Sequence, residues 1–235
     1  MQEAPGHQAP TGRRERNRQV LRRKLSDTAT AMFLEHGFDA VRVADVAQAC
    51  GVSTKTVWNH FPTKEALLLD RGERLATALR AVADEPTSQP DVLAVLGVVT
   101  SCIETELQEL AVGDPADAGS RDGEATWSVH AFVRLAETHP GLRAAAADRY
   151  EQLVRLAADA LAARSGDPAS SPRNQILAGA LISLWRLHLS ALLQASAEQP
   201  ALQDLQDHVR HEVQVGADLI AGYMATPAVH PDTSG

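Results

Sequence analysis

The sequence predicts an all-α protein of about nine helices. Three observations lead to this prediction. Apolar residues recur at helical spacing along most of the 235 residues, and strand-forming residues are sparse outside that spacing. Hydrophobic residues make up 44% of the chain but aromatic residues only 4%, with Ala abundant. Gly, Pro and capping residues divide the chain into segments of helix length. The chain is long enough for one or two domains with a sizeable core.

The first predicted helix follows residues 1–12, which are rich in Pro, Gly, Gln and Ala and are expected to form a disordered arm. Its inner stripe recurs at helical spacing, and Gly37 is expected to end it. The stripe consists of Leu21, Leu25, Thr28, Met32 and Phe33. A basic run leads into this helix, made of Arg13, Arg14, Arg16, Arg18, Arg22, Arg23 and Lys24.

Two short helices are predicted next, over residues 45–49 and 54–60. Gly51 suits the tight turn between them, because a residue without a Cβ adopts positive φ readily. Ser53 occupies the N-cap position of the second helix. Val57 and Phe61 share its inner face, which leaves five residues facing outward: Thr54, Lys55, Thr56, Trp58 and Asn59. Two short helices joined by a Gly turn, the second of them polar, predict a helix-turn-helix.

The remaining helices are expected between clear breaks. Pro62 and Thr63 open a helix that runs to about residue 83, and the segment 84–91 ends it. Further helices are predicted over 92–110, 127–138, 142–164, 173–197 and 200–224, with a loop over 113–123 and a flexible tail over 226–235. The last helix carries a long apolar seam made of Leu202, Leu205, Val209, Val213, Gly216, Leu219, Ile220 and Tyr223.

The charge of the chain is unevenly distributed. Up to Lys64 there are 10 Lys and Arg against 6 Asp and Glu, a balance of +4, and the rest of the chain carries −12, which gives the net −8. A basic N-terminal segment on an acidic body is compatible with nucleic-acid binding, because phosphates respond to the local charge. For the basic run of the first helix, a solvated face is the alternative to phosphate or minor-groove contact.

Cysteine usage and hydropathy indicate a cytoplasmic protein. Cys50 and Cys102 lie in different predicted helices without a CxxC spacing, which fits a reducing compartment and two small buried side chains. No apolar run approaches the ~18 residues of a membrane span, so no membrane partner is expected. The N-terminus lacks the apolar region of a signal peptide.

The helix-turn-helix stretch resembles the TetR-type transcriptional regulators over some 30 residues with intact spacing. The resemblance runs through Gly37-Phe38, Val43, Asp45-Val46-Ala47, Gly51-Val52-Ser53, Thr56-Val57, Trp58, His60-Phe61, Lys64-Glu65 and Leu67-Leu68. Three positions depart from the family pattern. Arg42 stands where Thr usually caps the first helix of the motif, Trp58 replaces a Tyr, and Lys55 replaces a frequent Gly. An Arg side chain cannot act as that cap.

The resemblance implies a helix-turn-helix DNA-binding domain over 13–64 and a ligand-binding and dimerisation domain over 65–225. It implies a homodimer, joined through the last two helices of each subunit, on palindromic double-stranded DNA with half-sites roughly 34–36 Å apart. Trp58, His60 and Lys64 stand where the family contacts phosphate. The expected DNA-binding residues are Arg18, Arg42, Ser53, Thr54, Lys55, Thr56, Trp58, Asn59, His60 and Lys64.

A weaker resemblance links the body to a class of TetR effector domains described as acyl-CoA-like ligand-binding. It rests on Val133-Arg134-Leu135, the run from His139 to Arg143 and Ala162-Ala163-Arg164, and it implies an acyl or other apolar small-molecule effector. The candidate effector-binding residues are Trp127, His130, Tyr150, Trp185 and His188. For each of them, core packing is the competing interpretation.

Metal binding and catalysis have little support in the sequence. His208, His211 and Glu212 have metal-capable spacing but lack a fourth ligand, so neither a metal nor a cofactor is expected. There is no nucleophile motif and no glycine loop for phosphate, so an enzyme is not expected. The prediction is a ligand-responsive homodimeric repressor. The alternatives are a helical small-molecule enzyme or carrier, and an architectural DNA binder without an effector.

Overall fold

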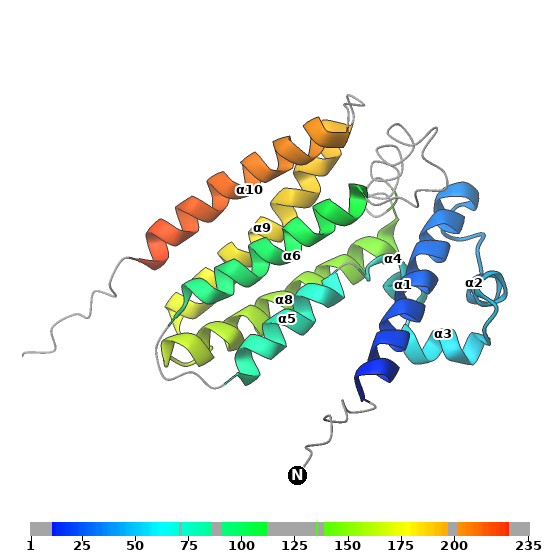
Figure 1. Ribbon diagram of the computed structural model, residues 1–235, viewed down its shortest axis with the longest axis horizontal. Helices are drawn as coiled ribbons and strands as arrows, with labels where there is room; N and C mark the ends of the chain where they lie inside the picture. The colour runs from blue at the N-terminus through cyan, green and yellow to red at the C-terminus, as the bar shows by residue number, and fades with distance from the viewer. Residues whose placement is uncertain are drawn as a thin grey trace, which may run out of the picture. The chain divides into compact units, whose positions relative to one another are not determined.

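The computed structural model describes residues 11–70, 72–85, 91–111, 135, 139–196 and 202–225, and these residues form nine helices and no strand (Figure 1). The all-α prediction is therefore confirmed. The chain divides into two compact units between Asp70 and Arg71. Residues 1–10 of the predicted arm, the loop over 113–123, the helix over 127–138 except Leu135, and the tail over 226–235 lie outside the described residues.

Four helices build the first unit: α1 (Thr11–His36), α2 (Val43–Cys50), α3 (Thr54–His60) and α4 (Lys64–Leu68). Helix α1 packs against α2 and α4, and α2 packs against α3. The predicted stop at Gly37 is confirmed, because this residue has φ +86° and its N–H donates to the Phe33 carbonyl. Side chains from all four helices fill a single core, among them Leu25, Phe33, Val46, Val57, Phe61 and Leu67.

The single helix predicted from Pro62 to about residue 83 is wrong. The structure has two helices there, α4 and α5 (Gly72–Asp84). Leu69 leaves the helical conformation with ψ 17°, and the carboxylate of Asp70 accepts a hydrogen bond of 2.7 Å from Arg22 Nε. The apolar side of the predicted helix also serves two cores, because Leu67 is buried in the first unit and Leu75 in the second.

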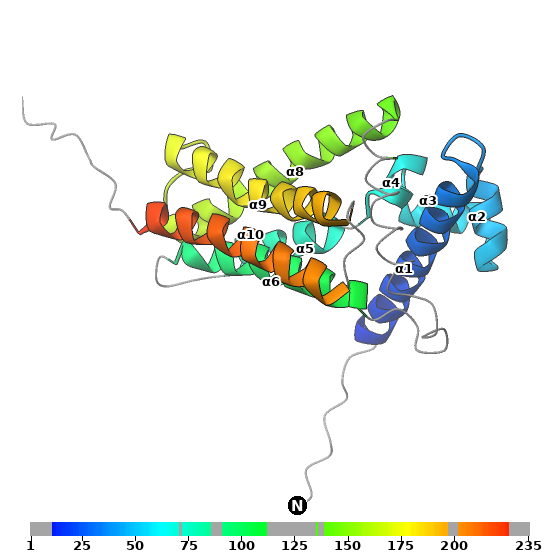
Figure 2. The ribbon, with the colours of Figure 1, turned by 90° about the horizontal axis from the view of Figure 1, so that it is seen from above.

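The second unit is a bundle of α5, α6 (Leu93–Ala111), α8 (Pro140–Ser165), α9 (Pro172–Ser196) and α10 (Leu202–Met224). Helix α6 packs against each of the other four, and Figures 1 and 2 show α10 running alongside α9. Ser171 caps α9, since its Oγ accepts from the Asn174 N–H at 3.2 Å. His139 caps α8 in the same way, with its Nδ1 accepting from the Leu142 N–H at 3.3 Å.

The apolar seam predicted on α10 is divided between two faces. Leu205, Val209 and Val213 are buried in the core of this chain, so they are not free to meet a second subunit. Leu219 and Tyr223, by contrast, are 73% and 53% exposed. Gly216 explains how closely α10 approaches α9, because a Cβ added there would lie 2.7 Å from Leu184 Cδ2.

Helix α9 contains a long apolar stretch. Over Pro172–Leu192 its mean hydropathy reaches 1.3, which by length and composition alone would be compatible with a membrane span. Half of that window is buried, however, and α9 packs against α6, α8 and α10. This is the environment of a helix in the core of a bundle.

Candidate nucleic-acid interface and effector site

The turn between α2 and α3 has the predicted geometry. Gly51 adopts the left-handed conformation with φ 72° and ψ 31°. Ser53 Oγ then accepts from the Thr56 N–H at 3.1 Å, which satisfies one of the free donors at the start of α3. Val57 and Phe61 are fully buried, so the inner face of α3 is fixed against the core of the first unit.

The outer face of α3 is accessible. Lys55 and Asn59 are exposed, and Trp58 is 45% exposed in spite of its large apolar ring. Thr54 and Thr56 are half-buried, and the Thr56 hydroxyl shares a hydrogen bond of 2.8 Å with that of Ser53. Of the five outward residues predicted, Lys55, Trp58 and Asn59 therefore present the freest side chains. An ammonium and an amide are groups that donate to base edges and phosphates.

Arg42 starts α2 without acting as a side-chain cap, as its chemistry requires. The Asp45 carboxylate instead accepts from the Arg42 backbone N–H at 2.9 Å and from its guanidinium at 2.8 and 3.2 Å. The hydrogen bonds from the Arg42 side chain and backbone lower the pKa of Asp45. Arg42 remains exposed, so its guanidinium lies at the surface with part of its donor capacity already used.

Lys64 has an interior position that its sequence pattern does not reveal. Its Nζ donates to the Phe38 carbonyl and lies 4.4 Å from the centroid of the Phe38 ring and 5.5 Å from that of Phe33. These contacts direct the ammonium toward the loop that follows α1. Arg18, another predicted contact residue, is exposed on α1.

His60, at the end of α3, is half-buried and belongs to a small network. Its carbonyl accepts from Arg22 Nη1 at 2.8 Å, and the Arg22 guanidinium lies 4.6 Å from the centroid of the Phe61 ring. Burial lowers the pKa of the imidazole, and the charges of Arg18 and Arg22 lower it further, while Asp70 opposes them. These effects favour the neutral form of the ring in the protein without DNA.

In the second unit, Trp185 and His188 are brought together as predicted. Their ring centroids are 4.6 Å apart in an edge-to-face arrangement. Both side chains are buried, and His188 Nε2 lies 3.1 Å from Glu106 Oε2 across the α6–α9 contact. The sequence did not indicate Glu106 as a partner of His188, because the two residues lie 82 positions apart.

Tyr150 does not join this pair. Its hydroxyl lies 3.5 Å from the Gly179 carbonyl and 3.4 Å from Ser183 Oγ. These residues precede His188 by nine and five positions, which places them on a different side of a helix with 3.6 residues per turn. The other two candidates, Trp127 and His130, lie outside the described residues. Of the five predicted effector residues, the structure brings together two.

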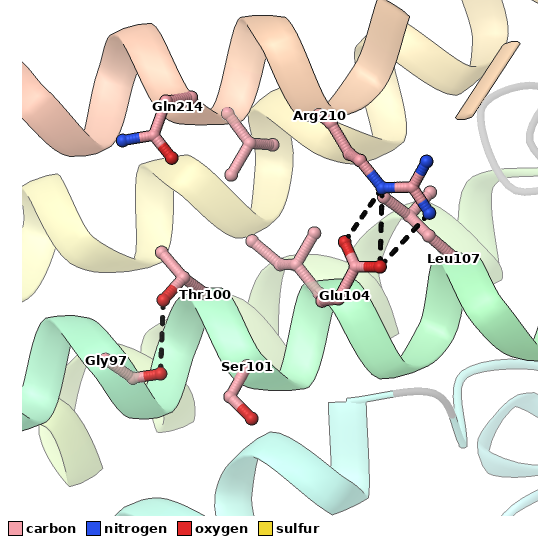
Figure 3. A pocket seen from close by; sticks show the side chains of 9 residues that line it. Gly97, Thr100, Ser101, Glu104, Leu107, Arg210 and Gln214 are labelled. Carbon is pink, nitrogen blue, oxygen red and sulfur yellow. Dashed lines mark hydrogen bonds and ion pairs between the residues drawn. The ribbon is translucent and has the colours of Figure 1, made fainter. Parts of the chain in front are cut away.

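A groove of about 350 Å³ between α6 and α10 was not predicted (Figure 3). At one end Arg210 makes a bidentate ion pair with Glu104, with Nε 3.0 Å and Nη2 3.1 Å from its oxygens. The hydrogen bonds from Arg210 lower the pKa of Glu104. The groove is lined by Gly97, Thr100, Ser101, Ile103, Glu104, Leu107, Arg210, Val213 and Gln214. No local pattern links residues 106 positions apart, so only the packing of α6 on α10 forms this groove.

In the part of the chain that the structure describes, His208, His211 and Glu212 on α10 do not form a metal site. His208 and His211 are exposed and Glu212 is half-buried. Among the described residues, no group of three His, Cys, Asp or Glu side chains is arranged to hold a metal ion.

Comparison with known proteins gives matches over both units. A model described as "Bacterial regulatory proteins, tetR family" matches residues 25–70, and one described as "MftR C-terminal domain" matches residues 111–215. The HTH-type transcriptional regulator TcmR of Streptomyces glaucescens is 28% identical over 160 residues, which are 66% of this chain and 65% of TcmR, just under two thirds of its length.

Two further comparisons concern a shorter match and a solved structure. The mycofactocin biosynthesis transcriptional regulator MftR of Mycobacterium tuberculosis is 34% identical over 61 residues, 26% of this chain and 29% of its own. The crystal structure of Thermus thermophilus FadR, a TetR-family repressor in complex with lauroyl-CoA, is 20% identical. Its match covers 89% of this chain and 98% of that chain, with a TM-score of 0.46.

Proposed function

Because this chain belongs to the TetR family of bacterial regulatory proteins, we propose that it is a DNA-binding transcriptional regulator controlled by a small molecule. The first unit would bind operator DNA, and the second would bind the effector and a second copy of the chain. The DNA that it would bind lies in the cytoplasm, which is therefore its proposed location.

The observation that carries this proposal is the outer face of α3. This helix is capped by Ser53, held from behind by Val57 and Phe61, and presents Lys55, Trp58 and Asn59 to solvent. A short rigid helix with exposed donors is what the major groove accepts. We propose that Lys55 and Asn59 contact base edges, while Arg18, Arg42, Ser53, Thr54, Thr56, Trp58, His60 and Lys64 position the helix on phosphates.

Each contact residue has a proposed role that fits its surroundings. Trp58 would use its indole N–H, because it lacks the hydroxyl of a Tyr. Arg42 would use the guanidinium donors that Asp45 leaves unoccupied. The Nζ of Lys64 is engaged with Phe38, so Lys64 would contact phosphate through a backbone N–H at the start of α4.

A dimer would provide the two reading helices that a palindromic operator needs, about one duplex turn apart. The exposed apolar side chains Val215, Leu219 and Tyr223 follow one another every four residues along α10, and Ile176 on α9 is 60% exposed. We propose that these residues meet their copies in a four-helix interface. An effector that prefers the subunit arrangement with the wrong spacing of the two heads would then release DNA, which makes repression the expected mode.

The effector is proposed to bind in the second unit near Trp185 and His188. A mostly apolar site with a few convergent polar groups is typical of small-molecule sites, and this pair combines a large apolar ring with a buried imidazole. The effector would be apolar in most of its surface. If it were turned over, the enzyme or carrier interpretation would replace this one, and if no small molecule loosened the complex, the architectural interpretation would.

The test is operator binding by fluorescence anisotropy at several salt concentrations, with duplexes tiled across the promoter of the protein's own gene. Lys55→Ala and Asn59→Ala are each expected to cost about 1–3 kcal/mol on one of these duplexes and to relax its preference at one base pair. The matched control is Arg155→Ala, which removes one positive charge from an exposed position on α8. Equal affinities of all three variants and the wild type would remove α3 from the interface.

A further inference from the structure

His188 has one nitrogen that is satisfied and one that is not. The side chain is fully buried, and its Nε2 lies 3.1 Å from Glu106 Oε2. Its Nδ1 is also buried and has no hydrogen-bond partner among the residues that the structure describes. An unmatched polar atom in a core costs free energy, so the atom requires an explanation.

The charges around His188 indicate which tautomer it adopts. An ionised carboxylate only accepts hydrogen bonds, so Glu106 fixes the proton of His188 on Nε2. A second proton on His188 would leave a buried N–H at Nδ1 with no acceptor among the described residues. A protein core tolerates an unmatched acceptor more readily than an unmatched N–H, so the geometry agrees with the neutral ring.

A neutral ring with its proton on Nε2 presents a lone pair at Nδ1. Trp185 lies edge-to-face with this ring, and Leu181, Leu184 and Leu192 of the same helix are buried in the core cluster of the second unit. A ligand that donates a hydrogen bond would satisfy Nδ1, whereas a carboxylate would meet the like charge of Glu106. The site would therefore favour a ligand that donates a hydrogen bond to Nδ1 over a ligand that carries a carboxylate there.

We propose that the effector is a neutral apolar molecule with a hydroxyl or N–H group, which it donates to His188 Nδ1. This inference rests on the proposed function, because it takes the ligand to be the effector. It narrows the apolar or acyl-type class to molecules that present a donor, such as phenols, alcohols and amides, and it disfavours free fatty-acid carboxylates. His188 would be the specificity-determining residue, and Glu106 the residue that sets its tautomer.

The probes for the test are three compounds with one skeleton: 2-naphthol, which has a donor, its methyl ether, which has none, and 2-naphthoate, which is an anion. Binding to the full-length protein is measured by isothermal titration calorimetry. The wild type is expected to bind 2-naphthol about tenfold more tightly than the methyl ether. In His188→Phe this ratio should fall to about 1–2, whereas the control His208→Phe, at an exposed position on α10, should keep it.

A second measurement covers the possibility that His188→Phe fails to fold. In the wild-type protein labelled with ¹⁵N-histidine, the Nδ1 resonance of His188 should report an unprotonated nitrogen and should shift with 2-naphthol but not with the methyl ether. Equal binding of 2-naphthol and the ether, or an unshifted resonance at saturation, overturns the proposal. So does tightest binding of 2-naphthoate with proton uptake, which would mean a charged ring and an anionic effector.

Failure of this inference and failure of the proposed function remain distinguishable. Operator binding is measured without any probe, and probe binding is measured without DNA. If the protein binds operator DNA but does not discriminate among the probes, only the proposed ligand class is rejected. If the protein discriminates among the probes through His188 but binds none of the promoter duplexes, the ligand-class proposal stands and the proposed regulatory function is rejected.

Discussion

Lys55 and Lys64 carry the same charge in very different surroundings. Lys55 is exposed on the outer face of α3, whereas Lys64 is half-buried and donates to the Phe38 carbonyl beside two aromatic rings. The Lys64 ammonium therefore stabilises the fold of the first unit, because a charged hydrogen bond and a cation–π contact both depend on it.

We predict that Lys64→Met, which keeps the apolar stem and removes the ammonium, lowers the free energy of unfolding by about 1–3 kcal/mol. Lys55→Met should leave it unchanged, because its side chain is solvated. Urea unfolding followed by circular dichroism measures both variants. If Lys64→Met kept the wild-type midpoint but lost operator affinity, the ammonium would be available to phosphate and the interior contact would be unimportant.

At the scale of elements, the approach of α10 to α9 depends on Gly216. A Cβ at this position would lie 2.7 Å from Leu184 Cδ2 and 3.4 Å from Leu187 Cδ2. Leu184 is buried in the core and has little room to move. Gly97, in the second turn of α6, has no atom of the described residues within 4 Å of the equivalent position. These two helical glycines therefore separate a packing effect from a helix-propensity effect.

Gly97→Ala is predicted to stabilise the protein by roughly 0.5–1 kcal/mol, because Ala favours a helix over Gly. Gly216→Ala gains the same propensity but must displace Leu184, at a cost of about 1–3 kcal/mol, so its net effect should be destabilising. Thermal unfolding of the two variants side by side gives the comparison. Equal stabilisation by both substitutions would show that the Leu184 side chain moves aside at little cost.

At the scale of the whole molecule, α10 has two apolar faces with different partners. One face, with Leu205, Val209 and Val213, is buried in the chain itself, and the other, with Val215, Leu219 and Tyr223, is exposed. Large apolar side chains exposed at regular spacing are characteristic of an interaction surface. The sequence showed one seam, and the fold assigns its members to two different contacts.

Leu219→Glu is therefore predicted to shift the protein from dimer to monomer while its melting temperature per chain changes little. Val213→Asp should instead destabilise the second unit, because it places a carboxylate at a buried position of the groove that Glu104 also lines. Sedimentation velocity and thermal unfolding separate the two outcomes, and Gln203→Glu, an exposed position on the same helix, is the control. A stable dimer in Leu219→Glu would place the interface on another surface.

The fold class and the outer face of α3 could be predicted from the sequence because their signals are local. Helical periodicity, the positive φ of Gly37 and Gly51, and the caps at Ser53 and Ser171 all act within about five residues. The burial of Val57 and Phe61 follows from the same spacing. These features depend on backbone geometry that the neighbouring residues dictate.

Only the tertiary structure decided the contacts between residues far apart in the chain. It divided the helix after Pro62 into α4 and α5, because its apolar residues serve two cores, and it buried Val213 while leaving Leu219 exposed. It also directed Lys64 toward Phe38 and placed Glu106 against His188. The partner of a long polar side chain depends on which helices pack together, and no periodicity along the sequence records that choice.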